Sequence, residues 1–153
     1  MFSFQPPVRI GGRKPVQTTG MRNYIIYGMS GWCLEIVWTG LGSLLSGDPR
    51  LAAKTYLWMF PIYGLAVLFE PVHDFIRPWP AVARGLVWML AFFAVEYLTG
   101  WLLRAAVGTA PWDYSRAAFQ IDGLIRLDYA PVWFFVGLLY EKEHDWLRRV
   151  KAR

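Results

Sequence analysis

Three glutamates of this 153-residue sequence, Glu35, Glu70 and Glu96, lie inside long apolar segments. A carboxylate at the depth of a bilayer costs on the order of 3 kcal/mol or more unless it is paired or hydrated, so such residues face a bundle interior or a cavity. Two interpretations stay open. Each glutamate forms a hydrogen bond to a Tyr, Trp or Arg of a neighbouring helix and only holds the bundle together, or the three form a ligand or ion site.

Helical spacing predicts that these carboxyl groups point inward. Glu35 follows Tyr27 and Gly31 at intervals of four residues, and Gly100 follows Glu96 at the same interval. Residues four apart share one face of a helix. Small residues on such a face let neighbouring helices approach closely in a membrane. We therefore expect the glutamates on packed faces.

A metal site is the alternative chemistry. Both histidines stand three residues after a glutamate, in Glu70-Pro71-Val72-His73 and Glu141-Lys142-Glu143-His144. One Glu from each of two helices plus Glu-x-x-His from two others is the ligand set of di-metal carboxylate bundles. The candidate ligands are Glu35, Glu70, His73, Glu96, Glu141 and His144. Distances along the helices from the nearest arginines separate the two halves of this set by about 8–10 Å, which favours a solvated charge cluster at residues 141–145 instead.

The composition indicates a membrane protein. Hydrophobic residues make up 56% of the chain, charged residues 18%, and there are nine Trp, eight Tyr and ten Phe. A soluble core of this size could not bury so many aromatic rings, whereas Trp and Tyr favour the bilayer interface. Four apolar segments are long enough to cross a bilayer, which takes roughly 20 residues. They lie near residues 24–45, 53–76, 85–107 and 127–146. We predict an all-α bundle of four transmembrane helices, with an interfacial loop or short helix between the third and fourth.

The basic residues predict the orientation. Eleven lie in the N-terminal tail, the second connection and the C-terminus, against five in the other two connections: Arg9, Arg13, Lys14, Arg22, Arg77, Arg84, Lys142, Arg148, Arg149, Lys151 and Arg153 against Arg50, Lys54, Arg104, Arg116 and Arg126. Basic loops stay in the cytoplasm. The prediction is a cytoplasmic tail at 1–21, a membrane domain at 22–147 and a basic cytoplasmic C-terminus at 148–153, in the inner or plasma membrane. The net charge of +5 thus signals topology, and no nucleic-acid partner is expected.

Several activities are not expected. The single cysteine, Cys33, provides neither a disulfide nor a cysteine-based metal site. A Walker-type glycine-rich loop is missing, so the chain does not itself hydrolyse ATP. Two histidines near helix ends do not assemble a Ser-His-Asp triad. Enzymatic activity is therefore not favoured, and the sequence names no cofactor.

The third connection, residues 108–126, alternates aromatic and aliphatic residues with Asp and Arg. This pattern suits a segment that lies in the interface or folds back into the mouth of the bundle. We expect Trp112 and Tyr114 to anchor it at the interface. Asp113 is expected to cap a short helix or to meet a cation such as Arg104 or Arg116.

Several motifs resemble one known family. They are Tyr27-Gly28 with Gly31-Trp32 and Glu35, Pro61-Ile62-Tyr63-Gly64, Glu96-Tyr97-Leu98-Thr99-Gly100, Trp112-Asp113-Tyr114-Ser115, Phe119-Gln120, Gly123, Ile125 and Leu127. Together they resemble the ABC-transporter type IV family, whose eukaryotic relatives are the transmembrane protein 229 group. The resemblance covers about residues 24–137. It implies a polytopic membrane fold and a permease-like role.

The leading hypothesis is a ligand-binding or transport-related membrane subunit. Its site would hold Glu35, Glu70 and Glu96 beneath the loop of Trp112, Asp113, Tyr114 and Ser115. The alternatives are a non-catalytic subunit of a larger membrane complex and the di-metal enzyme. Besides the lipid bilayer, a homo-oligomer or other membrane subunits are expected partners, because four helices are few for an alternating-access carrier.

Overall fold

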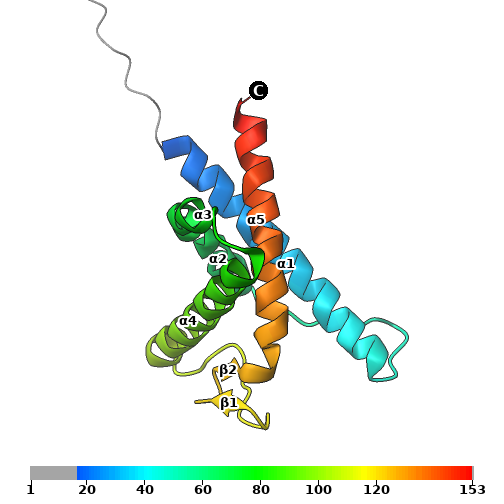
Figure 1. The fold of residues 1–153 in the computed structure, drawn as a ribbon. Helices are drawn as coiled ribbons and strands as arrows, with labels where there is room; N and C mark the ends of the chain where they lie inside the picture. The colour runs from blue at the N-terminus through cyan, green and yellow to red at the C-terminus, as the bar shows by residue number, and fades with distance from the viewer. Residues whose placement is uncertain (1–16, 153) are drawn as a thin grey trace, which may run out of the picture.

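The computed structural model describes residues 17–152, which fold into four helical segments (Figure 1). The long helices are α1 at Gln17–Leu45, α4 at Ala81–Val107 and α5 at Ala130–Ala152. The second segment joins α2 at Met59–Gly64, the 3₁₀ helix η1 at Leu65–Phe69 and α3 at Glu70–Ile76. The mostly helical fold class is therefore confirmed. Most of the predicted N-terminal tail lies outside the described residues.

The second segment begins later than predicted and is broken, for reasons that its prolines supply. Pro61 lies in the first turn of α2, where backbone N–H groups have no helical partner in any case. Pro71 lies in the first turn of α3 and has no N–H to offer to the preceding turn. The chain ahead of it tightens to 3₁₀ geometry, and the N–H of Glu70 bonds to the carbonyl of Val67.

Glycines set the close contacts between helices. A Cβ atom at Gly31 of α1 would collide with the side chains of Tyr63 and Tyr140. A Cβ at Gly137 of α5 would collide with Trp88 of α4. Both glycines therefore admit an aromatic side chain that any other residue would displace, as expected for packed membrane helices.

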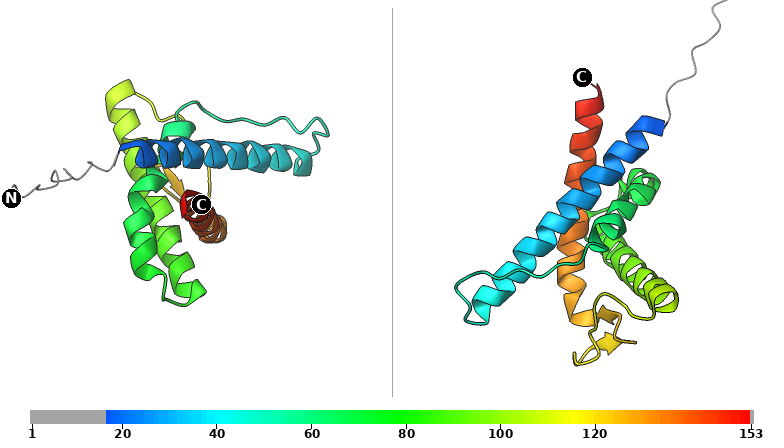
Figure 2. Two further views of the ribbon diagram at one scale, coloured as in Figure 1. Left: turned by 90° about the horizontal axis from the view of Figure 1, so that it is seen from above. Right: turned by 180° about the vertical axis from the view of Figure 1, so that it is seen from behind.

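The two ends of the described chain lie at the same end of the molecule (Figures 1 and 2). Ion pairs hold the turn after α3 and the start of α4 against the C-terminal half of α5, through Arg77 with Asp145 and Arg84 with Glu141. The connection between α4 and α5 lies at the opposite end of the molecule. The chain therefore runs an even number of times from one end of the molecule to the other.

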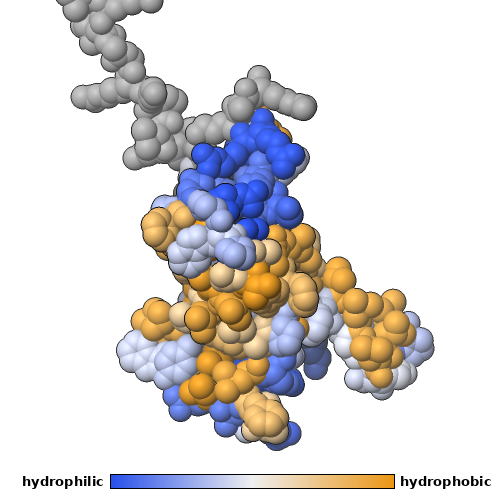
Figure 3. Space-filling model, in the orientation of Figure 1, coloured by the Kyte–Doolittle hydropathy of each residue, from blue (hydrophilic) through white to orange (hydrophobic). Residues whose placement is uncertain are grey.

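Two stretches of residues 17–152 are long and apolar enough to cross a membrane, namely Met59–Ile76 and Ala81–Val107. Most of their side chains are not buried within the chain, and α4 exposes Leu86, Leu90 and Leu98. Figure 3 shows apolar residues across the middle of one face and hydrophilic residues over the end where α5 finishes. The other two long helices, α1 and α5, have 29 and 23 residues but carry more polar side chains.

The connection from α4 to α5 contains a small antiparallel ribbon. Strand β1 at Gln120–Ile121 pairs with β2 at Ile125–Arg126, and the 3₁₀ helix η2 at Leu127–Tyr129 leads into α5. Asp122 and Gly123 form the turn with φ of 52° and 69°. The left-handed region suits glycine, and aspartate tolerates it. The predicted interfacial loop is thus a folded ribbon with one 3₁₀ turn.

Candidate functional site

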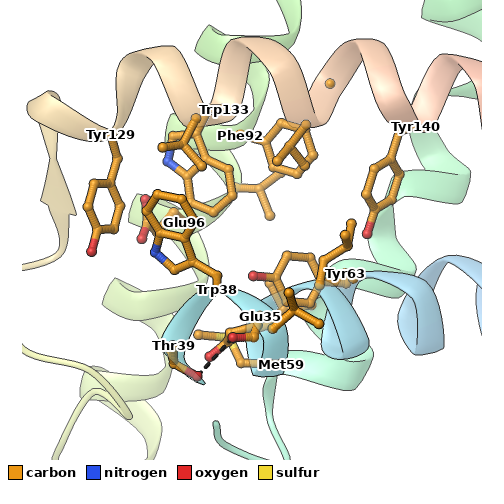
Figure 4. Close-up of a pocket in the computed structure, with 18 of the residues that line it drawn as sticks. Glu35, Trp38, Thr39, Met59, Tyr63, Phe92, Glu96, Tyr129, Trp133 and Tyr140 are labelled. Carbon is orange, nitrogen blue, oxygen red and sulfur yellow. Dashed lines mark hydrogen bonds between the residues drawn. The ribbon is translucent and has the colours of Figure 1, made fainter. Parts of the chain in front are cut away.

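A cavity with a volume of about 830 cubic ångströms lies between the helical segments. Its wall includes side chains from α1, α2, α3, α4 and α5 and from the connection after α4. Figure 4 shows Glu35, Tyr63 and Glu96 around it together with several aromatic rings. A volume of this size accommodates a small organic molecule.

Glu35 brings one carboxyl group from α1. The hydroxyl groups of Tyr63 and Thr55 lie beside this carboxyl, yet its Oε2 is buried and has no hydrogen-bond partner of good geometry among residues 17–152. Buried polar atoms are nearly always paired. An unpaired carboxyl oxygen in a cavity wall is therefore available to a ligand.

Glu96 brings a second carboxyl group from α4. This residue is 8% exposed, and its Oε2 also has no partner of good geometry within the described chain. The Tyr114 hydroxyl and the Trp133 indole lie against the carboxyl group. Burial raises the pKa of the Tyr114 hydroxyl far above its ordinary value, and the neighbouring Glu96 adds to this shift. Tyr114 therefore stays a hydrogen-bond donor toward the cavity.

Aromatic rings form one wall of the cavity. Tyr129, Trp133 and Tyr140 project from η2 and α5, and the Trp133 ring stacks on Phe92 of α4 at 5.1 Å between centroids. Trp133 and Tyr129 were not predicted from sequence as site residues. Their signal was present, because Tyr129, Trp133 and Tyr140 recur at intervals of four and seven residues, which is one helical face.

Three of the four residues predicted in the loop before the ribbon line the cavity. Trp112 and Tyr114 line the cavity with Asp113, whereas Ser115 is outside its wall. Trp112 is 5% exposed and donates from Nε1 to the Leu124 carbonyl at 2.9 Å. It is thus buried within the protein instead of anchoring the loop at a lipid interface, because the ribbon folds over it.

Asp113 caps a turn and not a helix. Its Oδ1 accepts from the Ser115 backbone N–H at 2.9 Å and its Oδ2 from the Ser115 hydroxyl at 3.1 Å. Both bonds hold the pKa of the Asp113 carboxyl below its ordinary value, and the bond from the Ser115 backbone N–H has the larger effect. Arg104 donates instead to the Asp122 carbonyl at 3.0 Å. The short helix expected after Asp113 is replaced by this turn.

Glu70 lines another part of the cavity and already has partners. Its Oε1 accepts from Asn23 Nδ2 at 2.8 Å and from the Tyr27 hydroxyl at 3.1 Å. This is the arrangement in which a glutamate holds helices together. Of the three glutamates singled out from the sequence, Glu35 and Glu96 thus keep an unpaired oxygen.

The six predicted di-metal ligands do not meet in one cluster. Among the described residues, the one group of three or more metal-binding side chains with donor atoms within 4.8 Å is His73, Asp74 and His144. Glu141 is bound by Arg84 and by Trp88 instead. The carboxyl groups of Glu35 and Glu96 belong to the aromatic part of the cavity. Of the six candidates, this group of three contains His73 and His144.

The match to known proteins comes from a sequence model of one family. A family described as "Putative ABC-transporter type IV" matches residues 22–148. The chain belongs to this family. The match spans all four helical segments and the ribbon, so the cavity lies within the family's domain. No solved structure matches the fold significantly. Membership of this family, together with the two apolar helical stretches, indicates a transporter-related membrane protein.

Proposed function

We propose that this chain is a ligand-binding subunit of a membrane transport system, and that its cavity takes a small organic cation. The observation that carries the proposal is the pair of unpaired carboxyl oxygens, on Glu35 and Glu96, in an aromatic-lined cavity of about 830 cubic ångströms. A cationic ammonium group supplies both the positive charge and the hydrogen-bond donors that these oxygens lack.

The charges of the cavity support a cationic ligand. Six carboxyl groups and one lysine line it, besides two histidines: Glu35, Asp48, Glu70, Glu96, Asp113 and Glu141, with Lys54, His73 and His144. Asp48 and Glu141 are paired with Arg50 and Arg84, so the other four carboxyl groups supply the negative charge. Tyrosine and tryptophan rings attract cations through the negative face of the ring. Trp133, which stacks on Phe92, provides such a ring beside Glu96. An anion would meet repulsion in the same cavity.

The proposal includes a four-span arrangement with both termini in the cytoplasm. α1 and α5 are about 43 Å and 34 Å long, enough to cross about 30 Å of hydrocarbon. The end of the molecule at which the described chain begins and finishes carries Arg22, Arg77, Arg84, Arg148 and Arg149. The positive-inside rule assigns that end to the cytoplasm.

We also propose a second copy of the chain as its partner. The last part of α1, which ends at Leu45, projects away from the other helices beside the connection that follows it (Figure 2). Leu45 and Leu57 in this region are 89% and 79% exposed. A second copy would cover these residues and enlarge a four-helix unit to the size of a carrier. Native mass spectrometry from nanodiscs should give a homodimer; a monomer, or a complex only with other proteins, contradicts this part.

Binding to purified full-length protein tests the cationic ligand. Benzylamine and phenethylamine, which are protonated primary amines with N–H donors, are compared with the matched neutral benzyl alcohol and the anion benzoate by thermal shift and by microscale thermophoresis. Only the cations should bind. Replacing Glu96 with Gln should weaken binding about 10- to 100-fold, the value of one charge-assisted hydrogen bond of about 1.5–3 kcal/mol.

Glu143→Gln is the matched control, because Glu143 accepts from Ser30 outside the cavity wall. This variant should bind the cations as the parent protein does. Equal binding of benzylamine and benzyl alcohol, or an unchanged affinity in both Glu35→Gln and Glu96→Gln, would refute the cationic ligand. Binding of benzoate in preference to the amines would refute it as well.

A further inference from the structure

Two buried histidines meet at the end of the cavity opposite the ribbon. His73 of α3 and His144 of α5 are 4% and 6% exposed, and their ring centroids are 4.3 Å apart. Three of their four ring nitrogens, both of His73 and Nε2 of His144, have no hydrogen-bond partner within residues 17–152. Burial of three unpaired ring nitrogens is unfavourable. These atoms are therefore available to an external ligand.

A carboxylate completes the cluster. Oδ1 of Asp74 lies 3.5 Å from His73 Nδ1 and 3.7 Å from His144 Nε2, and the three donor atoms lie within 4.8 Å of one another. Ligands at about 2.0–2.1 Å from a tetrahedral ion are about 3.3–3.4 Å apart. The two distances from Asp74 Oδ1 exceed this spacing by only a few tenths of an ångström, and the two histidine nitrogens lie within 4.8 Å of each other. We propose a mononuclear divalent-metal site held by His73, Asp74 and His144.

Neighbouring groups orient both rings for this role. His144 Nδ1 lies 3.0 Å from the Tyr27 hydroxyl and 3.6 Å from Glu70 Oε1, which leaves Nε2 directed toward Asp74. His73 Nε2 lies 3.8 Å from Asp145 Oδ1, which leaves Nδ1 for the metal. Metal-binding histidines almost always place their second ring nitrogen against a carboxylate or another hydrogen-bond acceptor. His144 has this arrangement, whereas Asp145 Oδ1 is beyond hydrogen-bond distance of His73 Nε2 and would have to move closer to complete it.

The donor set selects the class of ion. Two imidazole nitrogens and one carboxylate suit Zn²⁺ and the other divalent ions of the first transition row, whereas Mg²⁺ and Ca²⁺ prefer oxygen ligands. The Asp74 side chain is 51% exposed, so an ion can enter from the aqueous end of the molecule. Three protein ligands leave an open coordination position, and both histidines face the cavity. The site is separate from Glu35 and Glu96, and its existence does not depend on the proposed cationic ligand.

One cation of the chain competes for the site. Arg148 forms an ion pair with Oδ1 of Asp74, the same oxygen that faces the two histidines. A bound metal would share or displace this guanidinium. Arg148 is on the exposed side of α5, so its removal should leave the fold intact while freeing the carboxylate. Arg148→Gln is therefore expected to raise metal affinity, which a purely structural cluster would not do.

Cobalt is the probe. Full-length protein in nanodiscs is stripped with a chelator and titrated with Co²⁺ alone, and the visible d–d absorption and the stoichiometry are recorded. One Co²⁺ per chain is expected, displaced by Zn²⁺ and not by Mg²⁺. Asp74→Asn and His144→Gln should each lower Co²⁺ affinity by more than 100-fold, because loss of a group outside the ligands already costs 10- to 100-fold.

The controls keep the outcomes distinct. Glu143→Gln, one residue before His144 and bonded to Ser30, should bind Co²⁺ as the parent protein does. Arg148→Gln should bind it several-fold more tightly. Absence of a Co²⁺ spectrum in the parent protein, or equal or weaker binding by Arg148→Gln, overturns the proposal. So does wild-type affinity in Asp74→Asn, and none of these three results bears on whether amines bind near Glu96.

Discussion

Arg84 of α4 donates from Nε to both carboxylate oxygens of Glu141 on α5, at 2.9 and 3.0 Å. Trp88 donates to the same carboxylate from Nε1 at 2.7 Å. The two charged side chains are 15% and 1% exposed. A buried carboxylate is tolerated when it is both paired and hydrogen-bonded. Glu141 thus joins the two helices and is not free to bind a metal.

Replacing Glu141 with Gln should therefore destabilise the protein by about 3–5 kcal/mol, because Arg84 is left as an uncompensated buried charge. Thermal unfolding in detergent or steric trapping in bicelles measures the change. The exposed Arg149, for which residues 17–152 hold no ion pair, provides the control variant Arg149→Gln, which should change stability little. The double variant Arg84→Gln with Glu141→Gln should recover part of the loss. Additive losses would contradict a direct coupling.

Gly137→Ala should lower stability by about 1–3 kcal/mol, the cost of overpacking a helix contact. The new methyl group would collide with the Trp88 side chain, which cannot move without disturbing its bond to Glu141. Gly42→Ala is the matched control, since a Cβ there has no atom within 4 Å and alanine favours helix by up to about 1 kcal/mol. The same unfolding measurement should rank the control at or above the parent protein. The reverse order would contradict the close contact between α4 and α5.

Acidification should loosen the turn at Asp113. Its carboxyl has a pKa below the ordinary value in the folded chain, so its contribution is present above the unfolded pKa of about 3.9 and is lost as pH falls through the folded pKa. Hydrogen exchange of the peptide that spans residues 112–126 measures the opening. Protection should hold down to the ordinary carboxyl range and fall below it.

Two substitutions isolate this effect. Asp113→Asn keeps an oxygen for the Ser115 N–H but cannot titrate, so its protection should be independent of pH in the acid range. Asp113→Ala removes the acceptor and should lose protection at every pH. If Asp113→Asn shows the same acid-dependent loss as the parent protein, another carboxyl group is responsible.

Thiol labelling in intact cells should reveal the proposed topology. Cys33 is exposed on the surface of α1, near the middle of the helix, so it should face lipid and resist a membrane-impermeant maleimide. In a Cys33→Ser background, Ser46→Cys should label from outside. Arg149→Cys should label only after the cells are permeabilised. Labelling of Arg149→Cys in intact cells, or an equal response at both positions, would contradict cytoplasmic termini.

Much of the fold follows from the order of residue types along the chain. Apolar runs of about 20 residues predicted the positions of all four helical segments to within a few residues at most ends. The second segment was predicted as one apolar run, and neither its later start nor the 3₁₀ stretch before Pro71 was predicted. The ribbon was missed because two-residue strands are too short to produce a periodic pattern.

Part of the site could likewise be predicted from sequence, and part of it could not. Glu35 and Glu96 could be singled out from sequence because a carboxyl group in an apolar run is costly wherever the run packs. Their aromatic surroundings could not, since Phe92 and Trp133 stack across 41 residues of chain. Which faces of two helices meet depends on their crossing angle and rotation, and hydrophobic periodicity fixes neither.

The sequence by itself determined that the chain is helical, apolar and basic at particular connections, because these properties depend on local residue type. Only the tertiary structure decided that Glu141 binds Arg84, and that His144 instead meets His73 and Asp74. Glu141 and His144 are three residues apart on one helix, and from sequence both residues were candidate metal ligands. Their different partners come from α3 and α4, which contact α5 from 53 to 71 residues earlier in the chain. Such distant contacts are set by how whole helices pack, and no local pattern encodes that packing.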